Sequence, residues 1–242
     1  MNLPTGYDSP ADTKTPLPAG LYQAQLDYMY FSKADKYMTP YAYQEVQFKW
    51  LIYPGQEVDE ELLEVMKEEE SLDDQGLYGY SDRFTELDLK PETYDERTKR
   101  TYKASPFVRK LNALIAPKTF TAESTIDWHP SQKFTELGDF PIYKELTLAE
   151  NKAFEEANGA KPQGKDLFKD TGRTQTIYEG VMKDALVDGA SLQNKWVSIK
   201  LGLNQRGYNT IGTNDVNPLS AMERNFLKSA GFIKGGAIER PR

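Results

Sequence analysis

A loop with glycine at each end, set between two short alternating runs, restricts the fold of this chain more than any other feature. The runs occupy 195–201 and 207–216 of the 242 residues and are rich in β-branched and aromatic residues. That pattern is typical of an antiparallel β-hairpin. Side chains of a strand alternate between its two faces, so the apolar positions of the first run are predicted to face a core: Val197, Ile199 and Leu201.

The opposite face of this hairpin combines aromatic rings with cations, which is unusual for a surface in contact with solvent. The residues assigned to this face or to the turn are Trp196, Lys200, Arg206 and Tyr208. Aromatic rings stack on nucleobases and cations attract phosphates, and stacking contributes about 1 to 3 kcal/mol per base. The hairpin is therefore predicted to bind nucleic acid, with Trp196 and Tyr208 stacking on bases.

Three further strands are predicted before the hairpin, near 21–31, 43–53 and 77–89. Apolar and aromatic residues alternate with Gln and Asp in the first of them, which predicts one buried face. The residues of that face are Tyr22, Ala24, Leu26, Tyr28 and Tyr30. A helix is predicted over 105–116, because serine can cap its first turn and the following proline fits the first helical position.

The order strand, strand, strand, helix, strand, strand is that of an OB-fold, a five-stranded Greek-key barrel that binds oligonucleotides on an exposed sheet face. The predicted fold class is therefore mainly β, β-β-β-α-β-β, with helical insertions. The OB-fold-like domain spans 20–218 and carries insertions at about 55–76 and at 117–180. A flexible arm over 1–19 is predicted before it, and a helix and tail over 219–242 are predicted after it.

The net charge of −7 hides a division of the chain into an acidic and a basic part. Residues 1–96 carry 7 Lys and Arg against 21 Asp and Glu, whereas 97–242 carry 23 against 16. The carboxylates of 57–74 are predicted to lie on a helix. Three roles are open for them: a solvated helix face, an internal competitor for the basic site, or a docking surface for a partner protein. The basic part is predicted to contact the phosphates of a nucleic acid, and the affinity for that nucleic acid should fall as salt rises. The residues predicted to make these contacts are Lys99, Arg100, Tyr102, Lys103, Arg109 and Lys110.

Catalytic and metal sites have little support in the sequence. Cysteine is absent and His129 is the single histidine, which excludes thiolate metal sites and two-histidine zinc sites. The segment 159–166 resembles a phosphate-binding loop, but Asp166 stands where that loop needs Ser or Thr. The main prediction includes no enzymatic activity, cofactor or metal. A nuclease hypothesis remains, in which carboxylates near a strand end hold magnesium: Asp82, Glu86 and Asp88.

The location of the protein is predicted from what its sequence lacks. No apolar run has the length of a membrane span, and 1–20 has neither the basic start nor the apolar segment of a signal peptide. A soluble cytoplasmic protein without membrane contact is therefore predicted, and its oligomeric state is left open.

Three segments resemble bacteriophage single-stranded DNA-binding proteins of replication modules. They are GLYQAQL at 20–26, SPFVRKL at 105–111, and NKWVSI at 194–199 followed by GYNTI at 207–211. The resemblance implies binding to single-stranded DNA in phage replication or recombination, in the host cell cytoplasm and without catalytic residues. Many such proteins end in an acidic tail that recruits partners, whereas this chain ends with two arginines. The acidic segment 57–74 is then the candidate for recruiting replication or recombination proteins.

The main hypothesis is thus a non-enzymatic protein that binds single-stranded DNA with little sequence preference. One alternative is a phage structural or assembly protein without affinity for nucleic acid. The other alternative is a magnesium-dependent nuclease.

Overall fold

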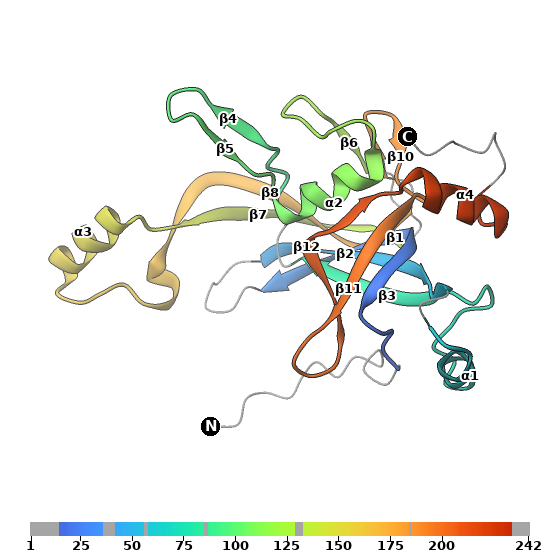
Figure 1. Cartoon of the computed structure of the whole chain (residues 1–242). Coiled ribbons are helices and arrows are strands. Elements are labelled where there is room, and N and C mark those ends of the chain that lie inside the picture. The colour runs from blue at the N-terminus through green and yellow to red at the C-terminus, as the bar shows by residue number, and fades with distance from the viewer. Residues whose placement is uncertain are drawn as a thin grey trace.

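The computed structural model describes residues 15–35, 42–55, 58–84, 87–128, 133–183 and 185–233. The protein is mainly β and is built around one large antiparallel sheet that does not close on itself (Figure 1). Five strands follow one another across this sheet in the order β12-β11-β1-β2-β3. Their bounds are β1 Gly20–Asp35, β2 Ala42–Tyr53, β3 Tyr78–Phe84, β11 Trp196–Leu203 and β12 Asn209–Pro218. The strands predicted near 21–31, 43–53, 195–201 and 207–216 are confirmed, and the third predicted strand ends earlier than expected.

The remaining elements surround this sheet. Four α-helices lie within the described residues: α1 Glu60–Glu68, α2 Pro106–Ile115, α3 Leu148–Asn158 and α4 Ala221–Ser229. Two small antiparallel pieces stand apart from the sheet. One is a hairpin of β4 Thr93–Asp95 and β5 Arg100–Tyr102, and the other joins β6 Ile126–Asp127, β9 Leu186–Val187 and β10 Ala190–Ser191. No helix in the described part of the chain has the length and apolar character needed to span a membrane.

The core lies between the sheet and α2. Ser105 caps this helix, because its hydroxyl accepts a hydrogen bond from the Val108 amide at 3.2 Å, and Pro106 occupies the first turn. The ring of Phe107 packs on that of Phe48 with centroids 5.2 Å apart. The predicted core residues of β11 are also buried here: Val197, Ile199 and Leu201. We call the sheet face that α2 covers the inner face and the opposite one the outer face.

A β-bulge in β1 changes which residues face outward. The pairing with β2 shifts between Leu26 and Tyr28, so Asp27 is an extra residue in the strand. The residues after the bulge therefore change faces: Met29 and Phe31 are buried at 1% and 3% exposure. The prediction that Tyr28 and Tyr30 share the buried face of Tyr22, Ala24 and Leu26 is wrong for this reason.

The two edges of the five-strand path approach one another without a backbone ladder between them. The Tyr80 hydroxyl of β3 donates a hydrogen bond to the Asn209 carbonyl of β12 at 3.2 Å. The Asn209 side chain also holds the chain before β1, because it accepts from the Leu17 amide at 3.0 Å and donates to the Leu17 carbonyl at 2.8 Å. Leu17 is completely buried. The flexible arm predicted over 1–19 lies outside the described residues up to 14, and at Leu17 the chain is fixed.

The insertion predicted over 117–180 is more regular than expected. Strands β7 Thr135–Glu145 and β8 Phe168–Met182 form a long antiparallel arm that carries α3 at its far end (Figure 1). The base of the arm joins the sheet, because the end of β8 pairs with Met29–Phe31 of β1. No residue of α3 is buried. The arm and its helix therefore project away from the core.

Candidate functional site

The outer face carries a set of aligned polar and aromatic side chains. The register places Trp196, Gln25, Leu51 and Gly79 in one row across β11, β1, β2 and β3. After the bulge, Tyr28, Lys49 and Ser81 form the next row across β1, β2 and β3. The bulge is what brings Tyr28 into this second row, so the geometry of one strand determines the composition of the face.

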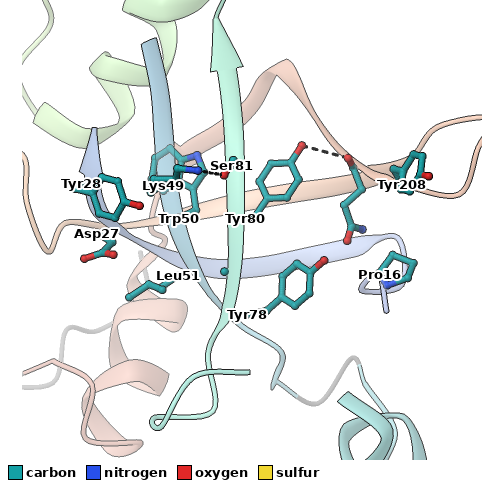
Figure 2. A pocket seen from close by; sticks show the side chains of 12 residues that line it. Pro16, Asp27, Tyr28, Lys49, Trp50, Leu51, Tyr78, Tyr80, Ser81 and Tyr208 are labelled. Atoms are coloured by element: carbon teal, nitrogen blue, oxygen red, sulfur yellow. Dashed lines mark hydrogen bonds between the residues drawn. The ribbon is translucent and has the colours of Figure 1, made fainter. Parts of the chain in front are cut away.

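A pocket of about 450 Å³ opens over β3 and its neighbours. Figure 2 shows β3 running between two groups of side chains that line this pocket. One group comes from β1 and β2, and the other comes from the edge of β3, the β11–β12 turn and the segment before β1. The first group is Asp27, Tyr28, Lys49 and Leu51; the second is Pro16, Tyr78, Tyr80, Tyr208 and Asn209. We call the outward residues of this lining the open half of the outer face: Asp27, Tyr28, Lys49, Leu51, Gly79, Ser81 and Tyr208. Tyr78 and Tyr80 pair with the buried Ile52 and Trp50, so they belong to the inner face and line the pocket at the edge of β3.

Lys49 is the cation of the open half. Its ammonium group donates a hydrogen bond to the Ser81 hydroxyl. Among the described carboxylates, none forms an ion pair with it. Partial burial lowers the pKa of the Lys49 ammonium below its ordinary value. A partly dehydrated ammonium that no described carboxylate neutralises gains most from a ligand that supplies an anionic or strongly polar acceptor atom.

Burial raises the pKa of three tyrosines that line the pocket: Tyr28, Tyr78 and Tyr80. Burial raises the pKa of the Tyr28 hydroxyl, and the neighbouring Asp27 carboxylate adds to the effect. Burial also raises the pKa of Tyr80, whose hydroxyl is already used on Asn209. Tyr208 is 47% exposed at the turn between β11 and β12. The pocket thus combines one lysine, Lys49, with the partly exposed rings of Tyr28 and Tyr208.

The other part of the outer face is covered by the end of the described chain. A capping box at Ser220 and Glu223 begins α4, and Glu223 accepts a hydrogen bond from Gln23 of β1 at 3.3 Å. The ring of Phe232, just after α4, lies 5.5 Å from that of Trp196 and 5.1 Å from that of Tyr53. We call Gln23, Tyr53 and Trp196 the covered half. Trp196 was predicted to stack on bases, but in this structure the ring of Phe232 packs on it and shields it in part from solvent.

The other residues predicted to bind DNA fall at separate places. Arg206 and Tyr208 lie in the exposed β11–β12 turn, and Tyr208 lines the pocket. Lys200 is exposed opposite Leu21 of β1. The β4–β5 hairpin, well away from the β11–β12 turn in Figure 1, carries or adjoins the exposed set Lys99, Arg100, Tyr102 and Lys103. The sequence predicted one phosphate path, whereas the structure separates its cations into two regions.

Two predicted phosphate ligands have structural contacts instead. The Arg109 guanidinium donates to the Asn214 side chain at 2.7 Å and to the Ala104 carbonyl at 2.9 Å. Lys110 is only 2% exposed, forms an ion pair with Asp82, and lies 5.0 Å from the centroid of the Phe84 ring. The prediction that Lys110 contacts DNA is therefore wrong. Its spacing of three residues from Phe107 and four from Leu114 places it on the apolar stripe of α2, a signal that the sequence contained.

The carboxylates of the nuclease hypothesis do not converge. Asp82 is buried against Lys110, and burial raises its pKa against the opposing effect of that lysine. An Asp88 carboxylate oxygen accepts a hydrogen bond from the Lys90 amide at 3.0 Å. Glu86 and His129 lie outside the described residues. Within the described ranges no three histidine or acidic side chains gather in a way that could hold a metal ion.

The segment that resembled a phosphate-binding loop lies at the end of the β7–β8 arm. It follows α3 directly, and Gly164–Leu167 forms a short 3₁₀ helix before β8. A phosphate-binding loop instead connects a strand to a following α-helix. The structural context of that motif is therefore missing.

Comparisons with models of protein families, with curated proteins and with solved structures found nothing that matches this chain.

Proposed function

We propose that this protein binds single-stranded DNA on the open half of its outer face, without enzymatic activity and with little sequence preference. The strand order β12-β11-β1-β2-β3, with α2 between β3 and β11, supports an OB-fold whose last pair of edges is bridged by side chains. OB-folds bind oligonucleotides on the face of their second and third strands and on adjacent loops. The pocket lies over β2, β3 and the β11–β12 turn.

The observation that carries this proposal is the composition of the pocket. Tyr28 lies beside Lys49 in one cross-strand row, and Tyr208 lines the same pocket on the other side of β3. None of the described carboxylates forms an ion pair with Lys49. Every nucleobase has an aromatic face, so stacking on tyrosine tolerates any sequence, while a lysine serves any phosphate. A duplex hides its base faces in the stack, which makes the single strand the form that these rings fit.

Arg206 extends the proposed path beyond Tyr208 into the turn. The basic residues of the β4–β5 hairpin lie at a different end of the molecule, so only longer strands reach them. On the resemblance to phage proteins, the proposed role of this activity is in phage DNA replication or recombination, in the host cytoplasm. The acidic helix α1, exposed over most of its length, is the proposed contact for other proteins of that process.

Fluorescence polarisation tests the proposal directly. A labelled oligo-dT of about 12 nucleotides is titrated with the protein as a single strand and as a duplex, at about 50 and about 200 mM salt. The expected result is preferential binding of the single strand. Its affinity should fall as the salt concentration rises, because the release of counterions from the DNA is then less favourable. Absence of binding at the lower salt concentration overturns the proposal.

The β7–β8 arm supports a second candidate function, a phage structural or assembly protein. Exposed Leu137, Ile142 and Leu148 lie on the arm and its helix, and apolar side chains without cover are typical of contacts between subunits. This candidate predicts concentration-dependent self-association in light scattering, without salt-sensitive affinity for DNA. The replacement of Leu148 by Ser should then abolish the association.

A further inference from the structure

Gly79 stands in the middle of β3 although its own surroundings do not require glycine. A glycine inside a strand weakens it, because it adds backbone entropy to the unfolded chain and has no side chain to pack. The backbone at Gly79 is outside the left-handed region that favours glycine, and a Cβ built on it meets no heavy atom within 4 Å. Neither backbone conformation nor crowding explains the residue, so open space above the strand is what distinguishes this position.

The open space lies where the pocket crosses β3. Gly79 faces outward beside Leu51, its partner in β2, and both line the pocket. Figure 2 shows the side chains of Lys49 and Leu51 on one side of β3 and those of Tyr78 and Tyr208 on the other. A side chain at position 79 would stand between these two groups. The missing side chain therefore keeps the two parts of the pocket continuous over bare backbone.

We propose that the DNA strand crosses β3 at Gly79, and that one nucleobase lies flat on the exposed backbone there. This inference rests on the proposed function and identifies the part of the nucleotide that the pocket receives. Glycine permits close approach of a ligand to backbone. Only peptide groups form the bottom of the pocket at this position, and a planar ring can lie flat on them. Lys49 then lies on one side of the base, where it donates to a phosphate or base oxygen, and Tyr208 lies on the other side.

The variant Gly79→Val tests this inference. Valine suits a strand and restricts the unfolded chain, and a Cβ at position 79 meets no heavy atom within 4 Å, so the melting temperature should stay constant or rise. Its side chain fills the place of the base. We expect a loss of about tenfold in affinity for oligo-dT, the size of one lost stacking contact. Affinity for an abasic strand of equal length, which keeps the phosphates and lacks the bases, should stay unchanged.

The control is Thr101→Val, which places valine at an exposed position of β5 outside the pocket and should leave both affinities unchanged. A second measurement uses the unmodified protein, so it does not depend on the folding of a variant. In ¹H–¹⁵N correlation spectra, the Gly79 amide should shift on addition of oligo-dT and stay in place on addition of the abasic strand.

Failure of this inference is distinguishable from failure of the proposed function. If the unmodified protein binds neither strand, single-stranded DNA binding itself is overturned. If it binds oligo-dT and Gly79→Val binds oligo-dT equally well, the proposed contact of a base with Gly79 is overturned while DNA binding stands. The same conclusion follows if Gly79→Val loses affinity for oligo-dT and for the abasic strand to the same degree. A Gly79 amide signal that shifts equally with oligo-dT and with the abasic strand likewise overturns the proposed contact of a base with Gly79.

Discussion

The open and covered halves of the outer face are built on the same strands and differ in what lies above them. Both halves combine aromatic rings with polar side chains, and one cross-strand row connects Trp196 in the covered half to Gly79 in the open half. Over Trp196 and Tyr53 the chain adds Phe232 and α4. Over Tyr28 the described chain adds only the Lys183 ammonium, 5.9 Å from the ring centroid, and a pocket remains beside Tyr28 and Lys49. An outward aromatic residue is therefore a binding candidate only where no other element of the chain covers it.

The largest expected effect concerns stability in the covered half. Trp196→Ala removes the ring that packs on Phe232 and should lower the free energy of unfolding by about 2 to 3 kcal/mol, near the lower end for a large aromatic residue because Trp196 is only half-buried. Urea denaturation measures the change, and affinity for oligo-dT at a temperature where the variant is folded should be unaltered. A large loss of affinity with unchanged stability would reverse the assignment of the two halves.

The next effect concerns binding in the open half. Tyr28→Ala removes an outward ring at the edge of the pocket and should weaken oligo-dT binding by about 1 to 3 kcal/mol. Stability should change by less than in Trp196→Ala, because Tyr28 does not belong to the buried core. Polarisation titrations of both variants on the same oligonucleotide measure the contrast. Equal affinities for the two variants would remove the functional distinction between the halves.

Replacement of Lys49 sharpens the electrostatic side of the comparison. Lys49→Met keeps the aliphatic stem and removes the charge, which should reduce affinity by about 1 kcal/mol and lower the salt slope by about 0.7. Lys200→Met, an exposed lysine outside the pocket, is the matched control and should leave the slope unchanged. A slope that falls equally in both variants would place the phosphate path elsewhere.

The lowered pKa of Lys49 also gives a pH dependence with a defined sign. DNA binds the charged ammonium, so affinity should fall as the pH rises through the lowered pKa of Lys49 toward the ordinary lysine value of 10.5. In Lys49→Arg the guanidinium stays charged over this range, and the decline should be absent. Titrations from neutral to alkaline pH measure both proteins, and parallel curves would contradict the role of Lys49.

The smallest expected effect is a gain of affinity. Asp27→Asn removes a carboxylate from the lining of the pocket, and the loss of its repulsion toward a phosphate should strengthen binding by about 0.5 kcal/mol at low salt. The gain should vanish at high salt, where the charges are screened. Unchanged affinity at low salt would show that the strand passes far from Asp27.

Most elements of the sheet could be predicted from sequence because their signals are local. Alternation predicted β1, β2 and the β11–β12 hairpin, and the Ser105–Pro106 pair predicted the start of α2. The β7–β8 arm was missed because its two strands are separated by α3, so neither short alternation nor a tight turn marks their pairing. The length of β8 becomes apparent only when its end pairs with β1.

The candidate site was predicted less well because its composition depends on contacts between distant segments. Tyr208 was predicted correctly as an outward residue, since the turn that exposes it is local. Trp196 was predicted by the same alternation, but its cover comes from Phe232, and Lys110 is buried by pairing with Asp82 of β3. Tyr28 was assigned to the wrong face because an extra residue in a strand leaves the local pattern almost unchanged.

The bulge at Asp27 has a consequence for the shape of the molecule as well as for its surface. Before the bulge, β1 pairs with β11 from Gly20 to Gln25, and after it with β8 from Met29 to Phe31. The extra residue thus stands where one strand passes from the main sheet to the base of the projecting arm. A bulge bends its strand and increases the local twist. Deletion of Asp27 would therefore straighten β1 and leave each remaining side chain of the strand on its present face. A single additional residue therefore governs the direction in which the arm leaves the sheet. A change in chain length at this point would reorient the arm without altering any side chain that lines the rest of the pocket.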